Sequence, residues 1–467
     1  MTAKDTIIDV SELIDGQNIG WFHVRILLLC GAGLFMDGFD VQSIAYVAPS
    51  LAKDWNLAPG ALGPVFGSGV VGLILGALIF APLADRIGRR PTLIFCVLAF
   101  GICTLATAWA DSLSSLMVMR FFTGLGLGGA MPTAIALTSE YSPARRRSIM
   151  VVAVFCGYSA GAACGGLIAA HVVPLFGWRA VFYLGGGASL VVAPLLIAAL
   201  PESIRILTRK GTEATRVLHI LRRLYPSLAL DAEMHFIERG KRLQGSPVRH
   251  LFRDGRTAAT ILLWLTFFMS LLDLFLLSQW LPTVINNVGF SVTTAVIATS
   301  LFQGGGTAGA LLLGWLMDRV GGCLVLGIAY ALAAIFIILI GLAGADITLV
   351  MLGIFGAGVC IIGGQIGLNA LAASFYPAVT GSTGVGWALG MGRFGSFVGP
   401  VVGGIMLAHG LDTKTIMLCA SLPALISAGA IAALSKFPAA AAEPNAEPSI
   451  APLNESALLA AGEPVQS

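Results

Sequence analysis

The chain has 467 residues, of which 57% are hydrophobic and only 11% are charged, and its mean hydropathy is +0.89. A soluble domain averages roughly a quarter charged residues, so this composition excludes an ordinary water-soluble protein. The net charge of +3 is small, and it gives no reason to expect a nucleic-acid partner.

Apolar stretches long enough to cross a bilayer recur along almost the whole chain. A hydrocarbon core about 30 Å thick needs around 20 apolar residues per helix. The sequence predicts twelve such helices, at residues 24–48, 59–83, 92–110, 115–138, 147–171, 178–200, 257–284, 291–317, 322–343, 347–373, 382–408 and 413–436. The 58 glycines and 21 prolines are consistent with this, because both are commoner in membrane helices than in soluble ones.

Composition divides the chain into five segments. Residues 1–20 form a cytoplasmic N-terminal segment that lacks the basic start and apolar core of a signal peptide. Residues 21–200 form one six-helix half and residues 256–436 the other. Between them, residues 201–255 form a basic cytoplasmic linker, with some helix expected around Glu213–Leu224. Residues 437–467 are rich in alanine, proline and glutamate, and we expect a disordered cytoplasmic tail there.

Lysine and arginine lie almost entirely on one side of this predicted arrangement. All but five of the 27 do so; the exceptions are Lys53, Arg179 and Lys414 on the other side and Arg120 and Arg393 within helices. Because cytoplasmic loops carry the excess of basic residues, we expect a multi-pass protein of the bacterial inner membrane with both termini in the cytoplasm. The eight cysteines are scattered singly, so the sequence predicts neither disulfides nor a metal site.

The two predicted halves repeat short motifs at nearly one offset. "PLADRIGRRP" contains Asp85 and "GWLMDRVGGC" contains Asp318, 233 positions later (318 − 85 = 233). "GYSAGAACGG" and "GSFVGPVVGG" end in glycine pairs 238 positions apart (403 − 165 = 238). Two independent matches indicate duplication. Duplicated halves that move about a midplane site are an established route to alternating access.

These motifs resemble the hallmark of the major facilitator superfamily, an Asp-Arg-x-Gly-Arg-Arg element between the second and third helices with a weaker copy between the eighth and ninth. The resemblance covers roughly residues 20–437 and implies an all-α membrane protein of twelve transmembrane helices in two pseudo-symmetric halves. Ala81 departs from the pattern, which has glycine four residues before the aspartate, and the second copy lacks its trailing arginines.

Further motifs occur along the chain. They are "DGFD" (Asp37–Asp40), "RFFTGLGLGGAMP" (Arg120–Pro132), "SEYSP" (Ser139–Pro143), "LPES" (Leu200–Ser203), "QWLP" (Gln279–Pro282), "FYP" (Phe375–Pro377) and "STGVGWALGMGRFGS" (Ser382–Ser396). In their order and number they resemble the aromatic acid:proton symporter family, which includes bacterial 4-hydroxybenzoate, protocatechuate and benzoate transporters. One departure is Gly381, which stands where this family has arginine before Ser-Thr-Gly.

Charged residues within helices are the first functional candidates, because burying them in a membrane costs several kcal/mol. Asp37 and Asp40 are three residues apart and share one helix face. Two such carboxylates cannot both ionise cheaply, which suits a proton carrier, although one of them could instead pair permanently with an arginine. Arg120 and Asp40 are expected roughly 8 and 12 Å below the outer surface, from 1.5 Å per residue. They could therefore form a pair that protonation releases.

Arg393 is the first candidate for the substrate's acid group, because a guanidinium presents a planar fork that matches a carboxylate. The alternative is that it binds the first-helix aspartates. Asp273 could be a second proton group, a partner of Arg393 or a contact for a ring hydroxyl. Four aromatic residues are candidates for stacking on a flat substrate ring: Phe35, Phe39, Trp280 and Trp387.

A further set of charged residues lies at predicted cytoplasmic helix ends and is expected to form a breakable salt-bridge gate without substrate contact. Positive-inside topology explains the arginines alone but not the acids Asp85 and Glu140. The set comprises Asp85, Arg86, Arg89, Arg90, Glu140, Arg145, Asp318 and Arg319.

Together these features predict a proton-coupled secondary transporter that imports an aromatic carboxylate and is not an enzyme. No cofactor is expected, because the glycine-rich stretches lack the Gly-Lys-Ser/Thr of a phosphate loop and the proton gradient remains as the energy source. The expected partners are the aromatic acid, protons and the lipid bilayer, with a monomer sufficient for function. The alternatives are a proton-coupled transporter of another small organic anion, or an exporter of the same fold.

Overall fold

The computed structural model describes residues 7–9, 14, 19–210, 217–218, 220–222, 235–237, 251–252, 257–376 and 381–437. Within these residues lie twelve helices of 19 residues or more, as the sequence predicts. The first six are α2 (Trp21–Asp54), α3 (Gly63–Ile87), α4 (Arg89–Thr107), α5 (Leu113–Tyr141), α6 (Arg147–Phe176) and α7 (Arg179–Ala199). The second six are α10 (Thr257–Asn287), α11 (Val292–Val320), α12 (Gly322–Leu342), α13 (Ile347–Phe375), α14 (Gly381–Ala408) and α15 (Thr413–Leu434).

Helix α2 departs most from its predicted bounds, since it continues past residue 48 through Pro49 to Asp54. Membrane helices tolerate proline where neighbouring helices and side chains satisfy the freed backbone groups. Among the described residues, eleven helices are long and apolar enough to cross a membrane by length and composition. Helix α2 is the remaining long helix, and it contains Asp37 and Asp40.

A few short elements lie outside these helices and leave the predicted all-α fold class unchanged. Strands β1 (Ile7–Asp9) and β2 (His235–Ile237) pair in parallel, with Ile7 opposite His235. Helix α8 (Ile204–Lys210) and a 3₁₀ turn (Ala144–Arg146) lie at helix junctions. The helix expected around 213–224 and the tail expected at 437–467 lie mostly outside the described residues, although 217–218 and 220–222 are helical.

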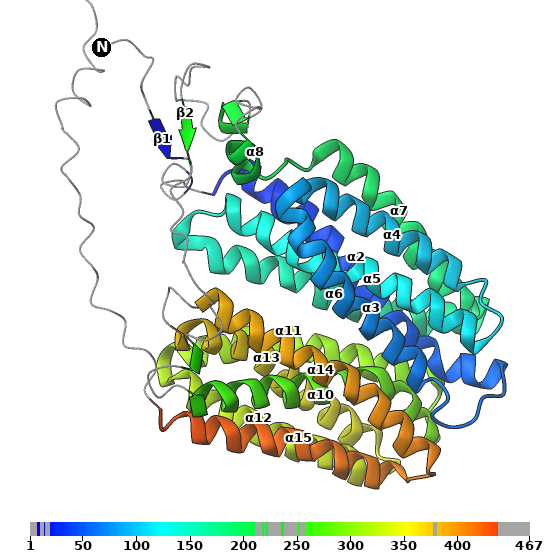
Figure 1. The fold of residues 1–467 in the computed structure, drawn as a ribbon. Coiled ribbons are helices and arrows are strands. Elements are labelled where there is room, and N and C mark those ends of the chain that lie inside the picture. Colours follow the sequence, from blue (N-terminus) through cyan, green and yellow to red (C-terminus); the bar gives the residue numbers. More distant parts are fainter. Residues whose placement is uncertain are drawn as a thin grey trace, which may run out of the picture.

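The twelve helices form two bundles of six, α2–α7 and α10–α15, which lie one above the other in Figure 1. Within each bundle the packing pairs correspond. The pairs α2–α6, α3–α5 and α4–α7 match α10–α14, α11–α13 and α12–α15. Gly88 and Gly321 end the second helix of each half with φ values of 133° and 105°, a region that favours glycine. They are 233 positions apart (321 − 88 = 233), the same offset as Asp85 and Asp318, so the structure supports the inferred duplication.

The repeated glycine pairs also have matching structural roles. A Cβ atom at Gly165 of α6 would lie 2.9 Å from the ring of Phe39 on α2. A Cβ atom at Gly403 of α14 would lie 2.4 Å from the ring of Trp280 on α10. In each half, therefore, a glycine on the fifth helix admits a bulky aromatic side chain from the first.

The bundle has two distinct ends. We call the end that carries the 86–90 and 145–147 arginines, together with the start of α2 and the end of α15, the basic end. The other, the opposite end, carries the short connections such as 55–62 and 409–412. At the opposite end the halves pack directly. Gly60 and Gly63 of the first half meet Gly404 of α14, and Phe66 lies edge-on to Trp280 with 4.9 Å between ring centroids.

The apolar core follows the same division. One buried cluster joins residues of both halves, including Phe39, Trp280 and Phe302. A second cluster lies mostly in the first half, and a third, around Phe267 and Tyr330, contains residues of the second half and Leu251 of the linker. The shared core thus lies toward the opposite end, whereas the third cluster toward the basic end joins the second half and the linker.

Candidate functional site

Asp40 of α2 and Arg120 of α5 form a buried ion pair, as their expected depths suggest. The guanidinium Nη1 lies 3.4 Å from Asp40 Oδ1, and Nη2 donates a 3.0 Å hydrogen bond to the Asp40 carbonyl oxygen. Thr104 of α4 donates to the same Oδ1 at 2.9 Å. Asp40 is 1% and Arg120 4% exposed. Among the described residues, Oδ2 of Asp40 has no hydrogen-bond partner.

Asp37 lies one turn before Asp40 and faces the second half of the protein. It is 2% exposed and interacts electrostatically with both Asp40 and Arg393 of α14. Arg393 in turn interacts with Tyr158 of α6. The ion pairs of the described residues do not include a direct Asp37–Arg393 contact. The guanidinium of Arg393, on the second half, therefore interacts with two residues of the first half, Asp37 and Tyr158.

Asp273 lies in the middle of α10 and is 1% exposed. Neither of its carboxyl oxygens has a hydrogen-bond partner among the described residues. The electrostatic neighbours of Arg393 are Tyr158 and Asp37. Of the three alternatives that the sequence left open for Asp273, the structure therefore gives no support to a pair with Arg393.

A polar link between the halves, which the sequence did not suggest, lies one to two turns beyond the aspartates. Gln42 of α2 donates to the carbonyl oxygen of Ser278 at 3.5 Å, and Gln303 of α11 donates to Ser278 Oγ at 3.3 Å. All three side chains are at most 4% exposed. Single polar residues in apolar helices gave too weak a pattern to single out, and the close approach of α2 to α10 was needed to reveal them.

The four candidate ring-stacking residues occupy different environments. Phe39 is buried against Gly165 and Gly185 within the first half. Trp280 is 2% exposed and donates from Nε1 to the carbonyl oxygen of Pro400 at 2.8 Å. Both therefore have packing roles. Trp387 is 46% exposed and stacks on Trp264, with centroids 5.8 Å apart and planes 15° apart. Phe35 on α2 is partly buried.

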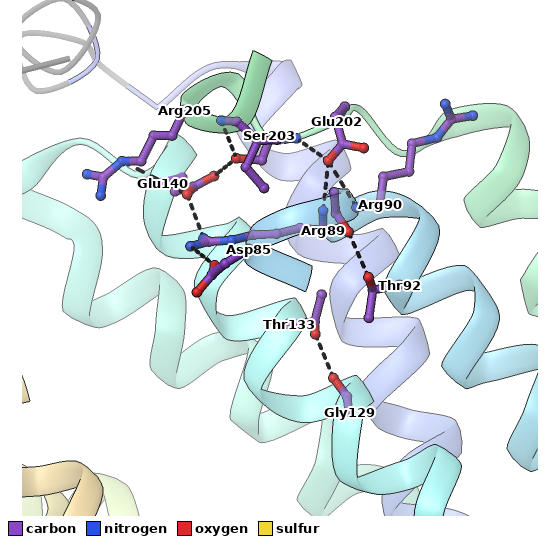
Figure 2. A network of polar contacts seen from close by, with 12 residues as sticks. Asp85, Arg89, Arg90, Thr92, Gly129, Thr133, Glu140, Glu202, Ser203 and Arg205 are labelled. Atoms are coloured by element: carbon purple, nitrogen blue, oxygen red, sulfur yellow. Dashed lines mark hydrogen bonds and ion pairs between the residues drawn. The ribbon is translucent and has the colours of Figure 1, made fainter. Parts of the chain in front are cut away.

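At the basic end, four predicted gate residues of the first half, Asp85, Arg89, Arg90 and Glu140, join one polar network (Figure 2). Arg89 forms ion pairs with Glu140 of α5 at 2.6 Å and with Asp85 at 3.3 Å. Ser203 donates to Glu140 at 2.5 Å, and Arg205 lies 4.0 Å from the same carboxylate. Glu140 is only 4% exposed. The network connects α3, α4, α5 and the start of α8.

Glu202 is the member of this network that sequence reasoning missed. Its Oε1 accepts hydrogen bonds from the backbone N–H groups of Arg89, Arg90 and Ser203 at 2.9, 3.1 and 2.8 Å. The first N–H groups of a helix have no acceptor within the helix, and the Glu202 carboxylate provides one for α4. Its negative charge also lies at the positive end of the helix dipole. The signal was available, because Glu202 is an acid directly after a membrane helix, in the "LPES" motif.

The remaining gate candidates are exposed. Arg86, Arg145 and Asp318 lie on the surface of the basic end, and Arg319 places its guanidinium 4.1 Å from the ring centroid of Trp315. Among the described residues, no group of three or more His, Cys, Asp or Glu side chains is arranged to hold a metal.

Comparison with known proteins identifies the family. The sequence profile of the Major Facilitator Superfamily matches residues 30–297 and 263–462. The chain is 39% identical to the 4-hydroxybenzoate transporter PcaK of Pseudomonas aeruginosa, over 91% of this chain and 95% of that one. It is 40% identical to the gallate transporter of Pseudomonas putida, over 92% and 95% of the two chains. It is 31% identical to the benzoate transport protein of Acinetobacter baylyi, over 90% and 91%.

Solved structures show the same fold at low sequence identity. The xylose transporter XylE from E. coli, in a partially occluded inward-open conformation, superimposes with a TM-score of 0.70 at 19% identity, over 90% of this chain and 98% of that one. A bacterial homolog of the human lysosomal transporter Spinster gives 0.69 at 16% identity, over 90% and 98%. The profile match, the relatives and the twelve-helix fold agree: this chain is a transporter, not an enzyme, and belongs to the Major Facilitator Superfamily.

Proposed function

We propose that the chain is a proton-coupled symporter that imports an aromatic carboxylate of the 4-hydroxybenzoate, protocatechuate or benzoate type by alternating access. The observation that carries the proposal is a set of buried charges: the Asp40–Arg120 ion pair within the first half, and Asp37 of the first half in electrostatic contact with Arg393 of the second. Relatives that transport 4-hydroxybenzoate, gallate and benzoate support the substrate class.

The basic end is assigned to the cytoplasm, in a bacterial inner membrane, because cytoplasmic loops carry the excess of lysine and arginine. The halves pack directly at the opposite end through Gly60, Gly63 and Gly404, so the described conformation is closed to the outside. On this assignment it is the inward-facing state, from which substrate leaves.

Arg393 is the group assigned to the substrate carboxylate. It carries a planar fork of donors, and the nearby carboxylate of Asp37 competes for it. A proton on Asp37 removes that competition and leaves the guanidinium available to the substrate. Substrate binding and protonation therefore favour one another, which is the coupling that a symporter requires.

Asp40 and Arg120 are assigned to the conformational step. Their pair joins α2 to α5 within the first half, and the proton bound by Asp37 would weaken it on transfer to Asp40. The same proton would leave Arg120 as a buried charge without its counter-ion, which is costly, so helix α2 would adjust relative to α5. Release of the proton at the basic end restores the pair and resets the carrier.

The energetics give the reason for coupling. Benzoate-type acids are anions at neutral pH, and moving one negative charge against an interior-negative potential costs about 2.3 kcal/mol per 100 mV. A proton that accompanies the anion cancels this cost, and the pH gradient then provides a driving force.

The test is uptake of labelled 4-hydroxybenzoate into proteoliposomes, with and without an inward proton gradient, in competition with unlabelled protocatechuate, benzoate and gallate. We expect gradient-driven accumulation that these acids inhibit and that Asp40→Asn abolishes. Asp412→Asn is the matched control, since Asp412 is an exposed residue at the N-cap position of α15, at the opposite end, and asparagine is equally favoured at that position.

Each negative result removes a defined part of the proposal. Folded, reconstituted protein that accumulates none of the four aromatic acids contradicts the substrate class, and dicarboxylates are then the next panel. Accumulation that survives Asp40→Asn at the wild-type level contradicts the role of Asp40. Uptake only by counterflow against preloaded substrate, with no response to the gradient, contradicts proton coupling.

A further inference from the structure

Asp273 is the one carboxyl group in the middle of α10, and the mechanism above does not use it. It is buried to 1% exposure, as deeply as Asp40. Asp40 has Arg120 and Thr104 as partners. Both oxygens of Asp273, by contrast, lack a hydrogen-bond partner in the part of the chain that the structure describes.

The helices packed against α10 offer Asp273 no counter-ion. They are α2, α11, α13, α14 and α15. Their described charged side chains away from the helix ends are Asp37 and Asp40 on α2 and Arg393 on α14. Arg393 interacts with Asp37 and Tyr158 rather than with Asp273.

The titratable group beside Asp273 is Tyr330 of α12, which interacts with it electrostatically. The Tyr330 hydroxyl donates to Ser270 Oγ at 2.8 Å, one turn before Asp273 on α10. A Cβ atom at Gly364 of α13 would lie 3.5 Å from the same hydroxyl. The carboxyl group thus lies at a junction of α10, α12 and α13 within the second half, whereas the α2 aspartates belong to the first.

An isolated carboxylate in such a place is expensive to ionise. Burial of a charge without a partner costs far more than burial of the neutral acid, so the group takes up a proton instead. Insertion scales place an aspartate at the centre of a membrane helix among the most costly residues. The neutral acid avoids this cost. Asp273 in its neutral form has a proton bound to its carboxyl group, so the described conformation is one in which this site holds a proton.

We propose that Asp273 is a second proton-binding site, separate from the α2 aspartates, and that one transport cycle carries two protons with each aromatic acid anion. The inference rests on the proposed symport and extends it. In each cycle Asp273 binds a proton from the outer solution, carries it as the neutral acid and releases it at the basic end. No bond other than the O–H bond forms or breaks.

The charge balance makes the proposal measurable. One proton with one monoanion moves no net charge, so its accumulation does not depend on membrane potential. Two protons move one net positive charge inward, and an interior-negative potential then drives uptake. At equilibrium, 100 mV corresponds to about a 50-fold change in accumulation for each net charge moved.

The experiment compares two driving forces in the same proteoliposomes, which contain the full-length chain and labelled 4-hydroxybenzoate. One is a pH gradient at zero potential, and the other is a potassium–valinomycin potential at equal pH. We expect both to drive accumulation by the wild type. In Asp273→Asn we expect the pH gradient still to drive accumulation and the response to potential to be lost. Tyr330→Phe removes only a neighbouring hydroxyl and leaves the Asp273 carboxyl group in place. It is the matched control, and we expect it to retain both responses.

The ratio of proton flux to labelled acid flux in the wild type provides a second measurement that needs no variant. Two protons per acid supports the proposal, and one overturns it even if Asp273→Asn fails to fold. Wild-type uptake driven by the pH gradient but indifferent to potential overturns the second proton site alone. A response to potential that persists in Asp273→Asn overturns the assignment to Asp273. Absence of uptake under either gradient instead overturns the proposed symport, and this inference with it.

Discussion

At the scale of single residues, Arg120 contacts Asp40 in a way that only arginine can reproduce. Its Nη1 lies against the carboxylate and its Nη2 against the backbone carbonyl of the same residue. A lysine at this position would carry the same charge on a single nitrogen. It could not hold both oxygens in the same geometry, because its ammonium group is a compact point charge and not a planar fork.

We therefore predict that Arg120→Lys lowers transport although it conserves charge. Loss of one buried charge-assisted hydrogen bond costs about 1.5–3 kcal/mol, so the rate of proton-driven uptake should fall by about 10- to 100-fold. The matched control is Arg179→Lys, whose 3.8 Å ion pair with Asp54 is half exposed on both sides and is expected to contribute little. Equal loss in the two variants, measured by initial uptake rates at matched protein levels, would contradict a special role for the buried pair.

Part of this residue-scale picture was predictable from sequence. Charges inside apolar helices identified Asp37, Asp40, Arg120, Asp273 and Arg393, and helix rise suggested the Asp40–Arg120 contact that the structure contains. Which aromatic residues face which neighbour was not predictable, because it depends on helix rotation. Phe39 is buried between α6 and α7, and Trp280 donates a hydrogen bond to α14. From sequence alone, the four aromatic candidates could not be ranked.

At the scale of elements, the turn between α3 and α4 depends on a glycine. Gly88 has φ 133° and ψ 147°, a region that only glycine adopts readily. A Cβ atom there would also lie 2.5 Å from Glu202 Oε2, the carboxylate that accepts from the first N–H groups of α4. Any side chain would strain the turn and displace the acid that caps the next helix.

Replacement of Gly88 by alanine is predicted to destabilise the first half. Backbone strain of this kind costs about 1–3 kcal/mol, and the displaced Glu202 contacts add to it. The melting temperature, followed by fluorescence-detected size-exclusion chromatography, should fall clearly below that of the wild type. Gly187→Ala serves as the control, since a Cβ atom at Gly187 of α7 meets nothing within 4 Å. An unchanged melting temperature in Gly88→Ala would show that the turn relaxes without cost.

The helices themselves were the most predictable elements, because a bilayer requires about 20 apolar residues per span and the chain contains little else. The largest error was at α2, where the apolar run ends near residue 48 but the helix continues to Asp54. The β1–β2 pair was missed for a different reason. Three-residue strands far apart in the chain leave no periodic pattern in the sequence.

At the scale of the whole molecule, a seam of small residues at the opposite end joins the two halves. A Cβ atom at Gly404 would lie 3.1 Å from Gly63 Cα and 3.2 Å from the Gly60 carbonyl oxygen. Both contacts are with backbone atoms, which cannot move aside as a flexible side chain does. The seam also forms the edge of an apolar groove of about 490 Å³ between α3 and α14, which includes Val401 and Phe397. Close approach here is what holds the described conformation closed at this end.

A larger side chain in the seam should shift the population toward a conformation in which the opposite end is open. Overpacking of a tight contact costs about 1–3 kcal/mol. Because Gly404→Val adds this cost only when the opposite end is closed, the ratio of open to closed molecules at that end should rise by about 5- to 100-fold.

Spin labels at Leu57→Cys and Leu411→Cys, in a background without the native cysteines, report the separation of the two halves at the opposite end. The variant should show an additional population at longer distance, and Gly429→Val, where α15 has open space, should match the wild type. A single short-distance population in Gly404→Val would mean that the seam deforms without opening, and that the halves are held together by the polar link through Gln42, Ser278 and Gln303 instead.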